Sequence, residues 1–351
     1  MSTIKKRKDD HVRICLKEDV VYRHNFFDDI EFMHFALTDL NYDDLDTETI
    51  FINHHLKYPF MITGMTGGYP EAKKINRRLA ALCEKYGIAF GLGSQRAMLE
   101  NPKMKDTYYV RDVAESIPII GNIGAVQISQ YGSSKINDML KDVDANYLAI
   151  HLNTLQELVQ PEGDRNFKGL RASVESLCRE IEFPVILKET GAGISRRVVN
   201  LFTGPKPYIK GIDVAGRSGT SWSRVEEFRG GDAGPFSEWG NPTPVCIVEV
   251  SRTGTFTIAS GGIRDGLDVA RAIALGADVG GGALVFIKAY YENTLEKTIE
   301  EKFITYLKRA MMLTNSQNLH ELFCCNIVIT GKTAEWMRTR GIDINSYANK
   351  R

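Results

Sequence analysis

One short stretch of the sequence combines several side chains that can do chemistry. Residues 147–153, YLAIHLN, read as an apolar strand that ends in a histidine and an asparagine. Gln156 and Glu157 follow shortly after, and QPEGD at 160–164 comes next. Imidazole and amide groups exchange hydrogen bonds, and a carboxylate can hold a hard cation. The spacing therefore predicts a polar site built from His151, Asn153, Gln156 and Glu157.

The elements that would position such a site recur along the chain as short apolar runs. Each run ends in small or polar residues and is followed by a segment of helical periodicity. Such helical segments occupy 70–87, 134–143, 171–181 and 265–277. The eight runs are FMITGMT (60–66), IAFGLG (88–93), IIGNIG (119–124), YLAIHLN (147–153), PVILKETG (184–191), GIDVAG (211–216), TFTIASGG (255–262) and VGGGALVF (279–286).

This alternation predicts an α/β fold, the (β/α)8 TIM barrel. Strands that are apolar throughout imply a parallel sheet covered by helices, and eight units over roughly 230 residues approach the usual barrel size of about 250. A doubly wound sheet is the alternative. We expect a single domain with an N-terminal cap (1–58), the barrel (59–290) and C-terminal helices (291–351), which include 306–314 and 333–341.

A barrel of this kind carries its chemistry at the carboxyl ends of the strands. SGGIRDG (260–266) and GGGAL (280–284) follow or form the last two strands, where glycine-rich loops and a helix N-terminus commonly bind a phosphate. Arg264 would add a charged donor. The alternative is that these glycines only make tight turns.

On the opposite strands, several donors could line a surface for a flat heterocycle. A lysine at the end of a buried strand, Lys188, needs an anionic or electron-rich partner, because burying an unpaired ammonium is costly. A flavin edge would serve, and pairing with Glu189 or Asp213 is the alternative. The residues of this surface are Met65, Thr66, Gly67, Ser94, Asn122, Lys188 and Thr220.

Bulk composition narrows the class of protein. The 44 basic and 44 acidic side chains cancel, so no net field would recruit nucleic acid or an anionic membrane. The six cysteines contain no C-x-x-C pair, which argues against zinc and against a disulfide scaffold. No run approaches the length of about 20 apolar residues that crossing a bilayer requires. We expect a cytoplasmic protein with reduced thiols and with neither a nucleic-acid nor a membrane partner.

Together these stretches resemble the type 2 isopentenyl-diphosphate isomerases, a family of flavin-dependent barrels. QPEGD after HLNTLQE is the most specific of the matches, whereas MTGG or SGG alone would be weak. The matching stretches are RKDDH (7–11), MTGG (65–68), GLGSQR (91–96), HLNTLQE (151–157), QPEGD (160–164), KETGAGIS (188–195), GIDVAGRSGTSW (211–222) and SGGIRDGLD (260–268).

The resemblance implies that the protein interconverts isopentenyl and dimethylallyl diphosphate. It implies reduced FMN and Mg²⁺ as cofactors, NADPH or NADH as reductant, and a homo-oligomer, either a tetramer or an octamer. By the same resemblance, Gln156 faces the reacting carbons and Glu157 binds the metal. His151 and Asn153 join Gln156 as catalytic candidates, because strand alternation points both toward the barrel mouth. The diphosphate of the substrate would be held by Arg7, Lys8, His11, Ser94, Gln95 and Arg96, and Gln156 would contact the substrate at its reacting carbons. FMN would be contacted by Met65, Thr66, Gly67, Ser94, Asn122, Lys188, Thr220, Gly262, Ile263, Arg264, Ala283 and Leu284.

One position departs from the family pattern. Ser218 stands where glycine is expected, and a side chain there would be costly if the backbone needs a positive φ or a close approach. By its chemistry, Gln156 is no acid of ordinary strength. We therefore expect it to orient the alkene or to relay a proton, with N5 of the reduced flavin as the principal acid-base group. His151 could bond the diphosphate, or could be a satisfied core histidine.

Two other classes of function remain. An FMN-dependent barrel oxidoreductase, acting on a hydroxyacid or another small phosphorylated substrate, would share the fold, but hydroxyacid oxidases need a histidine base after the sixth or seventh strand, and no histidine occurs there. A non-catalytic phosphate-binding barrel would leave the polar stretch at 151–157 without a role. The basic run at 5–8 could be a solvated tail, or could fold over the site from its own or a neighbouring subunit.

Overall fold

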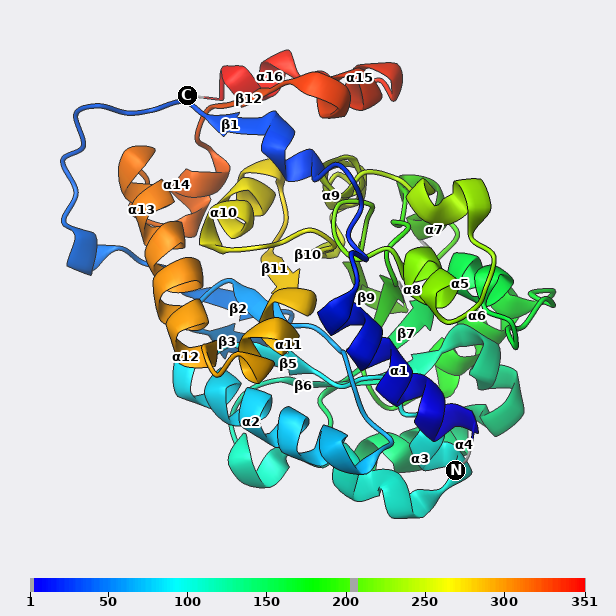
Figure 1. The fold of residues 1–351 in the computed structure, drawn as a ribbon. Helices are drawn as coiled ribbons and strands as arrows, with labels where there is room; N and C mark the ends of the chain where they lie inside the picture. Colours follow the sequence, from blue (N-terminus) through cyan, green and yellow to red (C-terminus); the bar gives the residue numbers. More distant parts are fainter. Residues whose placement is uncertain (1–2, 203–207, 351) are drawn as a thin grey trace.

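A closed barrel of eight parallel strands forms the centre of the molecule. The computed structural model describes residues 3–202 and 208–350, and the strands join in the order β10-β11-β4-β5-β6-β7-β8-β9 (Figure 1). This closed order confirms the predicted (β/α)8 barrel. Each strand overlaps one of the eight apolar runs. The strands are β4 (Phe60–Ile62), β5 (Ala89–Gly91), β6 (Ile119–Gly124), β7 (Tyr147–Leu152), β8 (Val185–Glu189), β9 (Ile209–Asp213), β10 (Phe256–Ser260) and β11 (Val279–Gly282).

Helices and short helical turns follow the strands and cover the barrel. In the first of them, Pro70 occupies the first turn, where its missing N–H costs nothing, and Gly87 ends the helix with φ 63°. The α-helices are α2 (Pro70–Tyr86), α3 (Arg96–Glu100), α4 (Ile128–Asp142), α5 (Thr154–Val159), α6 (Leu170–Glu180), α7 (Arg196–Val199), α8 (Trp222–Phe228), α9 (Thr243–Ser251), α10 (Gly266–Leu275) and α11 (Leu284–Tyr291). Shorter turns are η3 (Pro102–Thr107), η4 (Arg111–Val113), η5 (Ala125–Gln127) and η6 (Gly234–Glu238).

Apolar side chains cover both faces of the barrel strands. Met61, Ile120, Ile186 and Ile258 point inward and form the interior cluster. Alternate residues on the same strands point outward and pack against the helices. Both strand faces are therefore buried, which explains why the strands are apolar without alternation.

A hairpin closes the amino-terminal end of the barrel. It consists of β2 (Thr49–Phe51) and β3 (His54–Leu56). Phe51 is fully buried in the interior cluster, and its carbonyl oxygen accepts a hydrogen bond of 3.1 Å from the Tyr147 hydroxyl. With this end plugged, the carboxyl end is the open one.

The first helix, α1 (Thr3–Lys17), lies across the barrel and packs against α8 and α11 (Figure 1). Ile14 and Cys15 of this helix form a small apolar cluster with Val20 and Val225. Side chains of residues 1–6 lie outside the described part of the chain, so the predicted basic run is seen only from Arg7 onward. The helix brings the N-terminal segment to the site end of the barrel.

The segments before and after the barrel pair with each other. Strand β1 (Ile30–Phe32) is antiparallel to β12 (Ile327–Ile329), and buried Asp29 accepts hydrogen bonds from the backbone and hydroxyl of Thr333. The N-terminal turns are η1 (Phe26–Asp29) and η2 (Tyr42–Asp44). The closing helices are α12 (Leu295–Lys297), the π-helix η7 (Thr298–Ile304), α13 (Thr305–Leu313), α14 (Leu319–Phe323), α15 (Gly331–Thr339) and α16 (Asn345–Ala348).

The expected helices at 306–314 and 333–341 therefore appear as α13 and α15. The three-part division of the chain into cap, barrel and closing helices stays a prediction. Among the described helices, none combines the length and the apolar character that a membrane span requires.

Candidate active site

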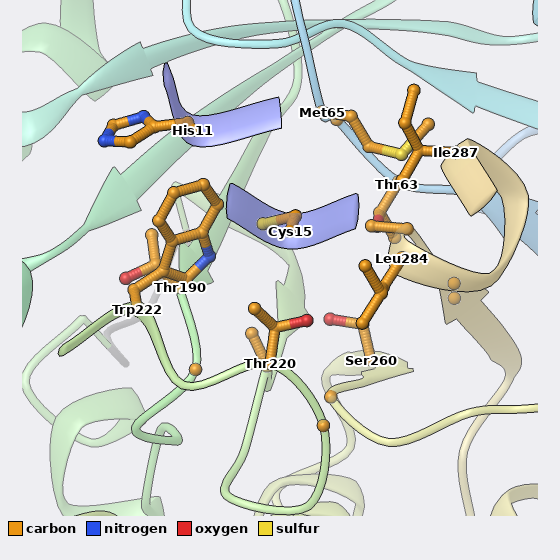
Figure 2. Close-up of a pocket in the computed structure, with 18 of the residues that line it drawn as sticks. His11, Cys15, Thr63, Met65, Thr190, Thr220, Trp222, Ser260, Leu284 and Ile287 are labelled. Carbon is orange, nitrogen blue, oxygen red and sulfur yellow. The ribbon is translucent and has the colours of Figure 1, made fainter. Parts of the chain in front are cut away.

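A cavity of about 730 Å³ opens at the carboxyl ends of the strands, a size typical of ligand and cofactor sites. Figure 2 shows that His11 and Cys15 of α1 face this cavity from one side, while Thr63, Thr220 and Ser260 face it from the barrel. The predicted site residues that line it are Arg7, Lys8, His11, Met65, Ser94, Arg96, Asn122, His151, Asn153, Gln156, Glu157, Lys188, Thr220, Gly262, Ile263, Arg264, Ala283 and Leu284.

The structure does not bring three predicted site residues, Thr66, Gly67 and Gln95, to the cavity wall. Gln95 is fully buried, and its Oε1 accepts a 2.9 Å hydrogen bond from the Asn122 backbone N–H. Gly67 is packed so closely that a Cβ would lie 1.9 Å from the Tyr108 ring. These residues shape the loops behind Met65 and Ser94, which do line the cavity.

A buried carboxylate that sequence reasoning missed, Glu226 of α8, organises one side of the cavity. Its Oε1 accepts hydrogen bonds from Gln156 Nε2 at 2.7 Å and His11 Nε2 at 2.9 Å, and its Oε2 pairs with Arg229. In the amide orientation that satisfies both of its ends, Gln160 bridges Glu226 Oε1 (3.3 Å) and Arg7 Nη1 (3.1 Å). Glu226 thus links α1, α5 and the QPEGD stretch.

The protonation states of this cluster follow from its burial and contacts. Burial acts to raise the pKa of Glu226, but the hydrogen bond and charge of His11 and the other donors outweigh it, and the pKa lies below its usual value. Burial also lowers the pKa of His11, against the opposing pull of Glu226. An ionised carboxylate only accepts hydrogen bonds, so His11 Nε2 and Gln156 Nε2 must both be donors. The Gln156 amide oxygen is then the end left for the cavity.

The basic residues of α1 form a second group, near the end of β5. Lys8 Nζ donates to the Ser94 carbonyl oxygen at 2.6 Å and to the Tyr108 hydroxyl at 2.7 Å. Burial, helped by the positive charge of Arg7, lowers the pKa of Lys8 to about 7. Burial and the like charge of Arg96 also lower the pKa of Arg7. Several cations therefore share one wall of the cavity.

His151 is held in one tautomer. Asn122 Nδ2 donates to the Leu92 carbonyl oxygen at 3.0 Å, so its Oδ1 must accept the 2.9 Å hydrogen bond from His151 Nδ1. Burial, with the charges of Lys188, Lys8 and Arg7, lowers the pKa of His151 to about 3. The imidazole is therefore neutral, and its unprotonated Nε2 is the nitrogen left for the cavity.

Glu157 is buried and held by two donors. Asn153 Nδ2 donates to its Oε1 at 2.8 Å, and the Asp164 backbone N–H donates to its Oε2 at 2.9 Å. The PEGD turn thus fixes this carboxylate, while Glu162 pairs with Arg229 at 2.8 Å. Within residues 3–202 and 208–350, no group of three or more His, Cys, Asp or Glu side chains could hold a metal ion.

Lys188 has the carboxylate partner that the sequence offered as one alternative. Its Nζ lies 3.0 Å from Asp213 Oδ2 and also donates to the Glu189 carbonyl oxygen at 3.0 Å. The Glu189 carboxylate instead accepts backbone N–H groups of its own loop, including those of Thr190 and Gly191. Lys188 nevertheless lines the cavity. Its two acceptors leave one of its three N–H donors unused.

The glycine-rich loops after β10 and β11 form the far end of the cavity. Gly261 and Gly262 have φ of 90° and 101°, and a Cβ on either would overlap neighbouring atoms, so only glycine suits these positions. The Arg264 guanidinium pairs with Asp268 at 2.7 Å and Asp28 at 2.5 Å, which raises its pKa, and its predicted role toward a phosphate stays a prediction.

Two helices begin at this end of the cavity. The N-terminus of α10 is capped by the side chain of Asp265, whereas that of α11 has no side-chain cap. Lys288 of α11 and Lys302 of η7 also line the cavity, and the sequence motifs did not indicate either one.

The serine that departs from the family pattern fits its place. Ser218 is fully buried and does not have a positive φ. Its Oγ donates to the Arg217 carbonyl oxygen at 2.6 Å and accepts a 3.3 Å hydrogen bond from the Phe26 N–H. The cost of a positive φ is therefore absent, and the side chain links the loop to η1.

Comparison with known proteins gives a consistent answer. No protein-family model matches the sequence. Isopentenyl-diphosphate delta-isomerases from Methanothrix thermoacetophila, Archaeoglobus fulgidus and Pyrococcus furiosus are 43%, 42% and 39% identical to it. The alignments cover 100%, 97% and 98% of this chain and 100%, 100% and 91% of the three relatives.

Solved structures resemble the barrel at much lower identity. A flavocytochrome b2 mutant has a TM-score of 0.63 at 16% identity, over 93% of this chain and 83% of that one. A mandelate oxidase mutant with an FMN adduct has a TM-score of 0.57 at 15% identity, over 92% of both chains. These likenesses support the fold alone. The full-length relatives decide the family: the chain belongs to the isopentenyl-diphosphate delta-isomerases, and its barrel is the fold of their type 2 branch.

Proposed function

We propose that the protein interconverts isopentenyl diphosphate and dimethylallyl diphosphate by a 1,3-allylic proton shift, with reduced FMN and Mg²⁺ as cofactors and NADPH or NADH as reductant. The observation that carries the proposal is that one cavity is lined by both halves of the required site. Glycine loops and Lys188 form one half, and the basic residues of α1 with Gln156 form the other.

The donor set and backbone of the first half fit FMN. The uncapped N-terminus of α11, together with the glycine backbone at 261–262, suits a phosphate group. Lys188 would face the electron-rich edge of the ring, near Met65 and Asn122. When bound in reduced form, FMN would supply an electron-rich flat surface and a weakly acidic N–H group.

The second half fits a diphosphate. Arg7, Lys8 and Arg96 are cations of like charge, and burial lowers the pKa of both Arg7 and Lys8. A bound anion would relieve both the burial cost and the mutual repulsion. Lys8 and Ser94 are joined through a backbone carbonyl, so an anion here would also fix α1 to the barrel.

Glu157 is suited to share a Mg²⁺ ion with the substrate. Mg²⁺ is commonly bound by one or two carboxylates together with substrate phosphates and water. Both Glu157 oxygens already accept one hydrogen bond each, which orients them and leaves further lone pairs for the metal. Since the described residues offer no complete set of protein ligands, we propose that the metal enters with the diphosphate.

The hydrocarbon end of the substrate needs dry surroundings and a positioned polar group. Met65, Trp222, Leu284 and Ile287 provide an apolar wall around the cavity (Figure 2). Gln156, held by Glu226, would present its amide oxygen to the reacting carbons and would stabilise developing positive charge or pass on a proton. The reacting end would then be kept apart from bulk water.

An anaerobic assay tests the proposal. Purified protein would receive FMN, Mg²⁺, isopentenyl diphosphate and either dithionite or NADPH, and the product would be identified with reduced and with oxidised flavin. Dimethylallyl diphosphate formed only under reducing conditions is the expected result. A yellow protein that forms no product would instead favour a flavin oxidoreductase with another substrate, and a colourless protein would favour a binding role.

We further propose a cytoplasmic homo-oligomer, a tetramer or an octamer. Six free cysteines suit a reducing compartment. Met33, Phe35 and Leu37 are 53%, 47% and 84% exposed on one short segment, which supports burial against another copy of the chain. Light scattering of the purified protein measures the mass, and a monomer at micromolar concentration would contradict this proposal.

A further inference from the structure

Three polar side chains lie at the ends of adjacent strands inside the barrel. Lys188 is the next-to-last residue of β8, Asp213 ends β9 and Ser260 ends β10, and the strand register pairs Lys188 with Asp213. Lys188 Nζ lies 3.0 Å from Asp213 Oδ2, and Ser260 Oγ donates a short hydrogen bond to Asp213 Oδ1. The lysine and aspartate side chains are only 14% and 4% exposed. Each carboxylate oxygen thus has its own partner.

The three residues stand at different depths. Lys188 and Ser260 line the large cavity, and Asp213 does not. Asp213 instead lines a separate cavity of about 20 Å³ within the barrel, which it shares with Lys188 and Asn122. Asp213 therefore contacts the lysine from below, on the side away from any ligand in the mouth.

We propose that Asp213, held by Ser260, is a positioning residue that fixes the Lys188 ammonium and sets the charge which the barrel presents to the cofactor. The inference rests on the proposed FMN site. The carboxylate lies 3.0 Å from the charged ammonium and so fixes its position. It also cancels most of that charge at a distance, because the pair as a whole is neutral.

The consequence concerns the balance between the forms of the cofactor. A full positive charge beside the ring would favour the more electron-rich reduced form and, within it, the deprotonated state. The Asp213 countercharge weakens both effects. An enzyme whose reduced cofactor must keep a proton available gains from such weakening, whereas a bare lysine would work against it.

The test is the reduction potential of bound FMN in the holoenzyme, measured by anaerobic spectroelectrochemistry. Asp213→Asn keeps the shape of the side chain and removes its charge. We expect reduced FMN to gain about tenfold in affinity over oxidised FMN, which corresponds to a shift of about +30 mV for a two-electron couple. The pH at which the reduced ring loses its proton should also fall. Lys188→Met should move the potential in the opposite direction.

Two further variants complete the test. Ser260→Ala should give a smaller shift in the same direction as Asp213→Asn, and it carries the test if Asp213→Asn does not fold. Asp278→Asn is the matched control, because Asp278 accepts the Thr257 N–H at the opposite end of the barrel and should leave the potential unchanged.

Wild-type potentials in both Asp213→Asn and Ser260→Ala, or a negative shift in Asp213→Asn, would overturn this inference while leaving the FMN site intact. Failure of the wild-type protein itself to bind FMN would instead overturn the proposed function, and that result is available before any variant is made.

Discussion

Shortening Gln156 by one methylene group isolates the contact that holds the proposed reacting amide. In Gln156→Asn the amide withdraws by about one C–C bond, so its distance from Glu226 Oε1 grows from 2.7 Å to about 4 Å. That separation is beyond hydrogen-bonding range. The amide loses its orientation, while Glu226 keeps its contacts with His11 and Arg229.

The size of the effect follows from the nature of the contact. A hydrogen bond to a charged group contributes about 1.5–3 kcal/mol. If this free energy serves to position the amide in the transition state, its loss lowers kcat by about 10- to 100-fold, since each 1.36 kcal/mol corresponds to tenfold. A larger loss, up to about 10⁴-fold, would indicate that the amide also takes part in proton transfer.

The assay is steady-state isomerisation by dithionite-reduced enzyme, with flavin absorbance as the measure of retained FMN. Gln130→Asn, at an exposed position of α4, is the matched control and should leave kcat unchanged. Glu226→Gln removes the charge of the acceptor and should also lower kcat, and the double variant should be little worse than Gln156→Asn alone, because both changes weaken the same contact. Near wild-type turnover in Gln156→Asn with FMN bound would refute the reasoning, and additive losses would refute the coupling.

Three further outcomes are expected. Because the folded state holds the pKa of His151 near 3 rather than 6.5, the stability that depends on neutral His151 is complete above pH 6.5 and is lost progressively as the pH falls toward 3. Denaturant unfolding of the free protein should show a loss of about 2 kcal/mol between pH 7 and pH 5. An identical pH dependence in His151→Asn would contradict this. Since Lys8 has a pKa of about 7, kcat/KM for the diphosphate should fall as the pH rises through 7 and the ammonium becomes neutral. Tyr108→Phe removes one acceptor from Lys8 and should move this fall to lower pH. An unchanged pH profile in the variant would exclude Lys8 as the source of the fall. In Gly67→Ala the new Cβ would overlap the Tyr108 ring and should cost about 1–3 kcal/mol of stability, whereas Gly211→Ala, whose Cβ would lie 3.4 Å or more from its neighbours, should lower the melting temperature much less.

The barrel could be predicted because each strand is buried on both faces. Such strands are apolar throughout and stand out in the sequence between amphipathic helices. The strand ends could also be located, which is why most of the predicted site residues meet in one cavity. Ser94 lines that cavity, but its neighbour Gln95 does not. A motif read as a unit cannot distinguish them, since the distinction depends on which way each side chain points.

The contacts made by separate segments could not be predicted. Glu226 lies in the run VEEF, which reads as an ordinary charged helix face, and nothing local distinguishes it from exposed Glu227. Its burial arises because α1 and α5 both pack against α8. Likewise, nothing in the sequence near Arg264 indicates its ion pair with Asp28, which comes from the distant N-terminal segment. A single sequence contains no record of such long-range pairing.

Without a bound anion, the buried positive charges of α1 are electrostatically unfavourable. Arg7 and Lys8 lie on α1. Burial and the neighbouring cations lower the pKa of both side chains. A diphosphate would supply the missing negative charge, so its binding must stabilise the closed position of α1 over any position in which these side chains are solvated. The linkage is reciprocal, so any change that destabilises the packing of α1 must weaken the binding of the diphosphate by the same free energy. Substitutions at Ile14, which packs on Val225 and does not line the cavity, should therefore raise KM without changing the groups that touch the substrate.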